Sequence, residues 1–250
     1  MATGKMTSHV LITTSVPMES VGIKHELGTF KTIRTGGRTV FSGSIENRAI
    51  RLIETGPGLV NTAQSLSAAI ETCAPDLILM TGCAGGFGRA GMGIGDIAIA
   101  SEENDAQLGI EPETAEAPLM PLPFDLGNID GVGIKHRIPM DSNMVSTALD
   151  SIKTAFSDIR INIQTGPFIT VSTITATNNN ADRLYNRFQP CMENMEGFAG
   201  AYIAKHYGVP FLEIRCASNL VGKRDRASWD LQIACERSAK AAIAFLLQEG

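Results

Sequence analysis

One stretch, from Met192 to Trp229, constrains the fold more than any other part of the chain. A small-residue helix is predicted over Gly197 to Tyr207, and the glycine–valine–proline turn behind it ends that helix. A buried apolar strand follows over Phe211 to Cys216. The strand then runs into the polar pair Ser218 and Asn219. Polar side chains at the carboxyl end of a buried strand lie where open α/β sheets bind their ligands.

Two carboxylates can be delivered to the same end of such a sheet. Glu196 stands at the start of the small-residue helix, and Glu19 follows the first predicted strand, Val10 to Thr14. Together with Pro17, Glu19 suits the first turn of a helix, where a carboxylate faces the positive end of the helix dipole. The alternative is that Glu19 lies in the ligand crevice. A carboxylate and an amide in one place suit a ligand with a sugar and a base.

The rest of the chain alternates between strands and helices. Together with one early hairpin, this order predicts an α/β fold, a three-layer sandwich with a central mixed twisted sheet, in a single domain over residues 1–250. Residues 1–9 are expected to form a disordered lead-in. The other predicted strands are Arg38 to Ser44, Arg48 to Thr55, Leu77 to Thr81, Ile97 to Ser101 and Gly166 to Ala176. A glycine turn within Glu54 to Ala63 is predicted to lead into a helix that ends near Thr72. The other predicted helices are Asp141 to Phe156, the helix after Thr177, and Ser228 to Glu249 with Ser228 as its cap.

Two segments without regular periodicity stand out. The loop after the Leu77 to Thr81 strand contains Gly82, Gly85, Gly86 and Gly88, so its main chain is nearly free of side chains. Such a loop lets a flat ligand approach the backbone, although it also suits a purely structural turn. The segment Ile110 to Ile138 is rich in Pro, Gly and acidic residues and is predicted to be a surface excursion, a candidate lid over the site.

Composition excludes several classes of function. The net charge is −5, and there is no basic tail, so no nucleic-acid partner is expected. The five cysteines are scattered without a C-x-x-C pair and are predicted to be buried thiols, and the four histidines lack ligand spacing, so no metal is expected. No apolar run reaches the roughly 18 residues that span a bilayer, and the N-terminus lacks an apolar signal region. A cytoplasmic protein without a membrane partner is therefore expected.

Several ordered motifs resemble one known family. The segments T-G-C-A-G-G with G-I-G-D-I, G-P-G-L-V-N-T-A, M-E-N-M-E-G and I-R-C-A-S-N are together similar to the purine nucleoside phosphorylase and nucleoside hydrolase superfamily. Within it they look most like the nucleosidases that cleave methylthioadenosine and S-adenosylhomocysteine. The N-M-E-G form and the tail S-N-L-V-G-K-R-D-R-A-S-W resemble the futalosine hydrolase branch, which removes hypoxanthine from futalosine in menaquinone biosynthesis.

The resemblance implies roles for particular residues. Glu19 would hold and deprotonate the attacking water, Glu196 would bind the ribose hydroxyls, and Asn219 would meet the purine edge. Asn194 replaces a second glutamate of the methylthioadenosine enzymes, which leaves its role open. The substrate-binding positions implied are Ala84 and Gly85 along the base and sugar, Thr175 within the base-pocket strand Thr173 to Thr177, Met195 beside the sugar, Ser218 at the base, and Asn194 with its part left open.

The chemistry fits these residue types. A nucleoside C–N bond breaks through a cation-like ribosyl transition state, so a carboxylate at the sugar is attractive there. Adenine-cleaving relatives carry Asp where this chain has Asn219. An amide N–H₂ donates to N7 and to a 6-oxo oxygen, which favours hypoxanthine or guanine over adenine. We therefore expect a hydrolase of a purine nucleoside such as futalosine, without cofactor, and a homodimer or larger homo-oligomer.

Two other activities remain open on the sequence. One is a methylthioadenosine/S-adenosylhomocysteine nucleosidase, and the other is a purine nucleoside phosphorylase, although the segment S-V-P-M-E-S lacks the arginine that phosphorylases of this family use for phosphate. A non-catalytic nucleoside-binding protein is disfavoured by the presence of both Glu19 and Glu196. Arg215 is expected to pair with a pocket carboxylate such as Glu196 or to hold the loop behind it. Arg224, Arg226 and Trp229 suit either a substrate carboxylate or a solvated loop.

Overall fold

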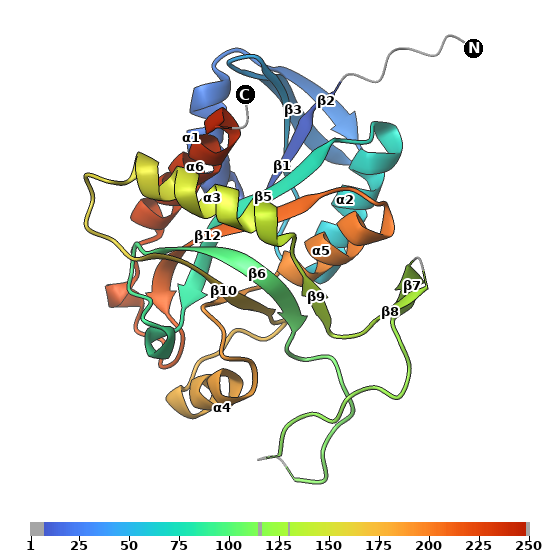
Figure 1. Cartoon of the computed structure of the whole chain (residues 1–250), viewed down its shortest axis with the longest axis vertical. Coiled ribbons are helices and arrows are strands. Elements are labelled where there is room, and N and C mark those ends of the chain that lie inside the picture. Colours follow the sequence, from blue (N-terminus) through green and yellow to red (C-terminus); the bar gives the residue numbers. More distant parts are fainter. Residues whose placement is uncertain (1–7, 115–116, 130, 249–250) are drawn as a thin grey trace.

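The apolar runs of the sequence form the middle of a ten-stranded mixed sheet (Figure 1). The computed structural model describes residues 8–114, 117–129 and 131–248. The strand order is β11-β10-β6-β12-β5-β1-β4-β3-β2, with β9 added beside β6. The strands are β1 (Val10–Thr14), β2 (Lys31–Thr35), β3 (Arg38–Ile45), β4 (Arg48–Glu54), β5 (Leu77–Gly86), β6 (Ile97–Asp105), β9 (Arg137–Pro139), β10 (Ile163–Thr170), β11 (Met192–Asn194) and β12 (Phe211–Leu220).

The central strands run in one direction. β1 pairs in parallel with β4 and with β5, and β5 pairs in parallel with β12. Their carboxyl ends therefore open on the same edge of the sheet, which is where ligands bind in sheets of this kind. β6 runs antiparallel to β12, and the hairpin β2–β3–β4 is antiparallel, so the sheet is mixed as predicted.

The far end of the sheet partly closes on itself. The short strand β11 pairs in parallel with β10 and also antiparallel with the end of β5, at Gly85 and Gly86. This closure is not predicted by the sequence. The glycines at the end of β5 allow it, because without side chains that strand can bend and accept a second neighbour on its free edge.

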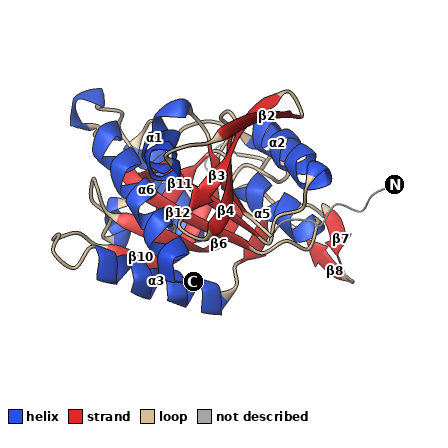
Figure 2. Cartoon of the chain, turned by 90° about the horizontal axis from the view of Figure 1, so that it is seen from above, coloured by secondary structure: helices blue, strands red, loops and turns tan. Residues whose placement is uncertain are grey.

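Helices cover both faces of the sheet (Figure 2). On one face lie α1 (Pro17–Leu27), α3 (Ser142–Ala155) and α6 (Leu231–Gln248), which pack over a core that includes Ile12, Leu79 and Phe245. On the other face lie α2 (Leu59–Thr72) and α5 (Gly197–His206), over a second core with Phe198 and Phe211. The predicted three-layer arrangement is confirmed. α4 (Asn178–Phe188) lies apart from both layers, near the carboxyl end of β10.

Helix capping follows the sequence closely. The side chain of Asp141 accepts from Met144 N at 2.8 Å at the start of α3, and Thr177 accepts from Asn180 N at 3.2 Å at the start of α4. The predicted cap of α6 was wrong. The helix begins at Leu231, and Asp230 caps it by accepting from Ile233 N at 2.9 Å. Ser228 lies in a one-turn 3₁₀ helix, Arg226–Ser228, that precedes it.

Strand ends differ most from the prediction. β5 continues through the expected glycine loop to Gly86, and β12 continues to Leu220, because each supplies hydrogen-bond partners to the other. β10 ends at Thr170 rather than at Ala176, since its pairing with β6 and β11 stops there. The segment predicted as a base-pocket strand, Thr173 to Thr177, is therefore a loop. Strand β2 was not predicted.

The excursion over residues 110–138 carries little regular structure. Within it lie the hairpin of β7 (Gly127–Ile129) and β8 (Val132–Ile134), followed by β9 on the edge of the sheet. Arg183 of α4 donates to the carbonyl of Ala117 at 3.4 Å, so the excursion runs beside α4. Its role as a lid stays a prediction.

The first and last strands, β1 and β12, flank β5 in one sheet, and from this we infer a single domain, as the sequence predicts. The lead-in expected over residues 1–9 falls mostly outside the described residues. His9, at its end, is buried, and its carbonyl accepts from Asp76 N at 2.9 Å. Among the described residues, no helix combines the length and apolar character needed to cross a bilayer.

Candidate active site

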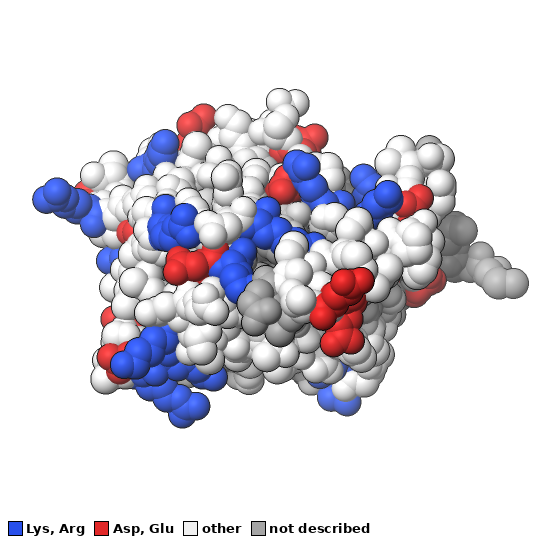
Figure 3. All heavy atoms as spheres, turned by 90° about the horizontal axis from the view of Figure 1, so that it is seen from below, with Lys and Arg blue, Asp and Glu red and all other residues white. Residues whose placement is uncertain are grey.

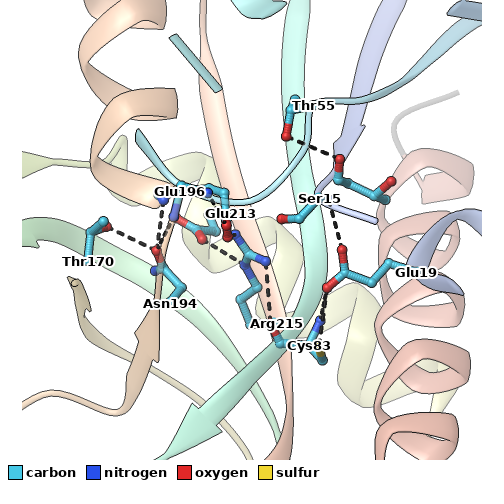
Figure 4. A network of polar contacts seen from close by, with 12 residues as sticks. Ser15, Glu19, Thr55, Cys83, Thr170, Asn194, Glu196, Glu213 and Arg215 are labelled. Carbon is cyan, nitrogen blue, oxygen red and sulfur yellow. Dashed lines mark hydrogen bonds and ion pairs between the residues drawn. The ribbon is translucent and has the colours of Figure 1, made fainter. Parts of the chain in front are cut away.

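Glu19 lies between two elements, at the start of α1 and beside the end of β5 (Figure 4). Its side chain is 2% exposed. One carboxylate oxygen, Oε2, accepts from Ser15 N at 2.8 Å and from Val16 N at 3.2 Å. The other, Oε1, accepts from Cys83 N at 2.9 Å. Glu19 therefore caps its own helix and also contacts the carboxyl end of the central strand, while its place in a ligand crevice stays a prediction.

Gly82 makes this approach possible. A Cβ atom at this position would lie 2.5 Å from Glu19 Oε1 and 3.0 Å from Arg215 Nη1, and the backbone φ is +150°. Only glycine leaves that space open at that backbone angle. Glu19 and Arg215 therefore meet over a main chain that carries no side chain.

Cys83 adds a further donor to Glu19. Its thiol donates to Glu19 Oε1 at 3.2 Å. A side-chain hydrogen bond to Cys235, burial and the charge of Glu19 all raise the pKa of Cys83. The group therefore stays a thiol. All five cysteines are free, and three of them, Cys191, Cys216 and Cys235, are buried.

Glu196 is held from two sides. As predicted, it precedes the first residue of α5. Its Oε1 accepts from Gly58 N at 2.9 Å in the glycine turn before α2, and its Oε2 pairs with Arg215 Nη2 at 3.4 Å. The pairing with Arg215 confirms one of the two alternatives for that residue. These contacts fix the carboxylate at the carboxyl edge of the sheet.

Arg215 is the buried cation of the site. It is 1% exposed, and its Nε donates to Glu213 Oε1 at 2.8 Å, while Nη1 donates to the carbonyl of Cys83 at 3.4 Å. Burial alone would lower the pKa of Arg215, but the charges of Glu213, Glu196 and Glu19 together raise it above its usual value. The guanidinium therefore stays charged among three carboxylates.

Asn194 organises the backbone that carries Glu196. Its Oδ1 accepts from Glu196 N at 3.0 Å and from Gly197 N at 2.8 Å, which satisfies amides at the start of α5. Its Nδ2 donates to Glu103 Oε1 at 2.5 Å. Glu103 is fully buried, and burial together with the charge of Glu213 raises its pKa well above the usual value. Asn194 therefore bonds both to the start of α5 and to the buried carboxyl group of Glu103.

The Ser218 and Asn219 side chains lie beside the end of β5. The hydroxyl of Ser218 lies 2.9 Å from Asn219 Oδ1 and 3.2 Å from the carbonyl of Ala84. Asn219 Nδ2 lies 3.2 Å from the carbonyl of Leu220. The serine orients the amide, so that its N–H₂ group is available for a second acceptor.

Three of the predicted residues contact or pair with the positions Cys83, Ala84 and Gly85. Glu19 bonds to the first, Ser218 lies against the second, and Asn219 pairs in register with the third. Thr175 connects to the same place through Glu193, whose Oε1 accepts from Thr175 N at 3.0 Å. Met195 is half-buried between Asn194 and Glu196 in the chain.

Three acidic residues near the site were not identified from the sequence: Glu103, Glu193 and Glu213. Each lies inside a strand and is buried. The sequence did contain a signal for Glu213. Glu213 and Arg215 are two residues apart in an apolar strand, so their side chains must share one face. Glu193 stands directly before the predicted residue Asn194, in the same M-E-N-M-E-G motif.

The described part of the chain gives little support for a metal ion or a nucleic acid as the ligand. There, no cluster of three or more His, Cys, Asp and Glu side chains could hold a metal ion. Figure 3 looks onto the face at the carboxyl ends of the central strands, and its basic side chains form separate groups with acidic ones among them. That surface lacks the continuous basic stripe typical of nucleic-acid binding.

Comparison with known proteins gives a consistent family. The model of the phosphorylase superfamily matches residues 9–248. A futalosine hydrolase of Acidothermus cellulolyticus is 34% identical over 67% of this chain, and the match spans 63% of that protein's length, less than two thirds. A 5'-methylthioadenosine/S-adenosylhomocysteine nucleosidase of Halalkalibacterium halodurans is 27% identical over 82% of this chain and 84% of its own.

A solved structure shares the fold. The 5'-methylthioadenosine/S-adenosylhomocysteine nucleosidase of Neisseria meningitidis, in complex with methylthio-immucillin-A, superposes with a TM-score of 0.81. The match covers 98% of this chain and 100% of that one at 21% sequence identity. At this identity the likeness establishes the architecture alone.

Proposed function

The chain belongs to the phosphorylase superfamily, and we propose that it is a nucleoside N-glycosidase that uses water to release a 6-oxopurine base. Futalosine is the substrate that this proposal favours, with hypoxanthine as the released base. The observation that carries the proposal is that Glu19 and Asn219 lie against the end of β5, to which Glu196 is linked through Arg215.

In this proposal, the role of Glu196 is to stabilise the sugar. Its carboxylate is held by Gly58 N and by Arg215, and the remaining lone pairs of its oxygens can accept ribose hydroxyls. When the C–N bond breaks, positive charge develops on the ribosyl group. A fixed negative charge beside it lowers the barrier, because the carboxylate needs no reorganisation in the transition state.

Glu19 favours water over phosphate as the nucleophile. The amides of Ser15 and Val16 at the start of α1 would suit an anion, but the Glu19 carboxylate already accepts from both. A phosphate at this place would meet a like charge. A carboxylate that faces the end of β5 can instead orient a water molecule and take its proton, which contributes about 10²–10⁴-fold to the rate.

Asn219 favours a 6-oxo base. The Ser218 hydroxyl lies beside the amide oxygen, which leaves the N–H₂ group to donate to N7 or O6 of a purine. A 6-amino group at the same position would place donor against donor. Polar mismatches of this kind in a pocket discriminate between substrates by up to about 10⁴–10⁵-fold.

The test is base release in the absence and presence of inorganic phosphate. Futalosine, aminofutalosine, inosine and methylthioadenosine are incubated with the enzyme, and the free base is quantified by chromatography. We expect hypoxanthine from futalosine and inosine without phosphate. Strict dependence on phosphate would make the protein a phosphorylase, and preferential release of adenine would make it a methylthioadenosine/S-adenosylhomocysteine nucleosidase.

The variant Glu19→Gln tests the water-activating role. Its turnover should fall below detection, while inosine still raises its melting temperature. Glu26→Gln, an exposed residue of the same helix, is the matched control and should retain full turnover. Turnover by Glu19→Gln at the wild-type rate would contradict the role. The homodimer or larger assembly expected from the resemblance stays a prediction, which light scattering can check.

A further inference from the structure

Glu193 is a buried acid at the base end of the site to which no role has been given so far. It lies in the middle of β11 and is 7% exposed. Its Oε1 accepts from Thr175 N at 3.0 Å, whereas its Oε2 is buried and has no hydrogen-bond partner in the structure. A buried carboxyl oxygen without a partner costs stability, so its retention calls for a ligand group that completes it.

The register of three strands places Glu193 opposite Asn219. Glu193 pairs with Gly85 across β11 and β5, and Asn219 pairs with the same Gly85 across β12 and β5. A Cβ atom at Gly85 would lie 3.9 Å from Glu193 Cβ and 3.4 Å from Asn219 Nδ2. The two side chains therefore stand on the same side of the sheet, one on each side of a glycine.

Glu193 and Asn219 flank the end of β5. Glu193 and Asn219 are separated by two inter-strand spacings, roughly 9–10 Å. The backbone of Gly85 lies between them, and the side chain of Val221 covers it, since its Cγ2 would lie 2.8 Å from a Cβ at Gly85. A purine bound between the amide and the carboxyl would therefore displace the Val221 methyl group from Gly85.

The surroundings of Glu193 favour its protonated form. Burial raises the pKa of this carboxyl, and the hydrogen bonds from Thr175 oppose the effect in part, with no charged group contributing. Its neighbours are Gly85 on β5, Ile169 on β10, Asn219 on β12 and Thr175 in the loop, all of them uncharged. Because Oε1 accepts from an amide, the proton belongs on Oε2, the atom without a partner.

We propose that Glu193 is a further catalytic residue, which donates a hydrogen bond from Oε2 to the purine and transfers its proton to the base as the base departs. This inference rests on the proposed N-glycosidase function. Asn219 cannot take this role, because an amide donates hydrogen bonds but does not give up a proton. A carboxylic acid kept neutral by its apolar site can do so.

The step balances in atoms and charge. The bond between C1′ and the base nitrogen breaks, and its electron pair goes to the base, while the O–H bond of Glu193 breaks and its proton moves to N3 or N7, the remaining base nitrogens that carry no hydrogen. Water forms the new bond to C1′, and its proton goes to Glu19. Exchange with solvent then returns Glu193 to the acid and Glu19 to the carboxylate. One water is consumed for each nucleoside.

The test compares two leaving groups in Glu193→Gln. Inosine releases a base that needs a proton, whereas p-nitrophenyl riboside releases a stable anion that does not. We expect kcat for inosine to fall by about 10²–10³-fold, while kcat for p-nitrophenyl riboside stays within about threefold of wild type. Glu102→Gln, a strand residue that pairs with Arg137, is the matched control and should leave both rates unchanged.

Each outcome decides the inference. Wild-type kcat for inosine in Glu193→Gln, or an equal loss with both substrates, would overturn the proton-donor role. If the variant does not fold, wild-type protein still provides the test, because kcat for inosine should fall at alkaline pH while kcat for p-nitrophenyl riboside does not. Identical pH profiles for the two would overturn the inference. Phosphate-independent hydrolysis by wild type, measured alongside, shows separately whether the proposed function holds.

Discussion

Replacement of Gly82 by alanine tests whether the site depends on the close approach of Glu19 to the central strand. The added Cβ would lie 2.5 Å from Glu19 Oε1 and 2.7 Å from its Cδ. An ordinary contact begins at 3.4 Å, so the carboxylate must retreat. The retreat amounts to roughly 1 Å, and a misplacement of that size in a catalytic group costs about 10²-fold in rate.

The backbone adds a second, separable cost. At Gly82 φ is +150°, an angle that residues with a side chain rarely adopt, and the strain amounts to about 1–3 kcal/mol. Gly37, in the turn between β2 and β3, has a φ of +80°, and a Cβ there meets nothing within 4 Å. Gly37→Ala therefore carries backbone strain without disturbing Glu19, which makes it the matched control.

The assay is the rate of hypoxanthine release from inosine, together with urea unfolding of both variants. We expect both variants to lose stability but only Gly82→Ala to lose about 10²-fold in kcat. If Gly82→Ala keeps the wild-type kcat, or if Gly37→Ala loses as much, then the contact of Glu19 with the Gly82 backbone does not position the catalytic group.

Three further changes test the rest of the site. Asn219→Asp should raise the ratio of kcat/KM for adenosine to that for inosine by at least about tenfold. Competition between the two nucleosides measures this ratio, and an unchanged ratio would argue against base selection by Asn219. Arg215→Met should lower the free energy of unfolding, measured in urea, by about 3–5 kcal/mol, because Glu196 and Glu213 lose their buried cation. A loss below about 1 kcal/mol, which is typical of an exposed ion pair, would contradict this. The pKa of Glu103 is raised in the folded protein, so Glu103 keeps its proton there, whereas the unfolded chain releases that proton above about pH 4.5. The stability that protonated Glu103 contributes is therefore lost as pH rises from about 4.5 toward the folded pKa. Glu103→Gln should flatten that decline between pH 5 and 8 relative to wild type, and parallel stability curves for the two proteins would refute the assignment.

Local patterns in the sequence were enough for the alternation of strands and helices. An apolar run such as Leu77 to Thr81 indicates a buried strand, whichever strand pairs with it. Caps such as Asp141 and Thr177 bond within one turn of their own helix. The same locality explains the errors. Where β10 ends and where β5 continues depends on which neighbour strand offers hydrogen bonds, and that neighbour is distant in the chain.

The sequence by itself determined the fold class, the motifs of the family and the residues Glu19, Glu196 and Asn219 as candidates. It could not decide between a capping and a site role for Glu19, because only the packing of α1 against β5 brings Cys83 N to its carboxylate. It also could not assign Glu193, since that assignment depends on two separate strands pairing with one glycine. Periodicity reports which face of its own strand a residue occupies, whereas strand order and register across the sheet are set by the tertiary fold.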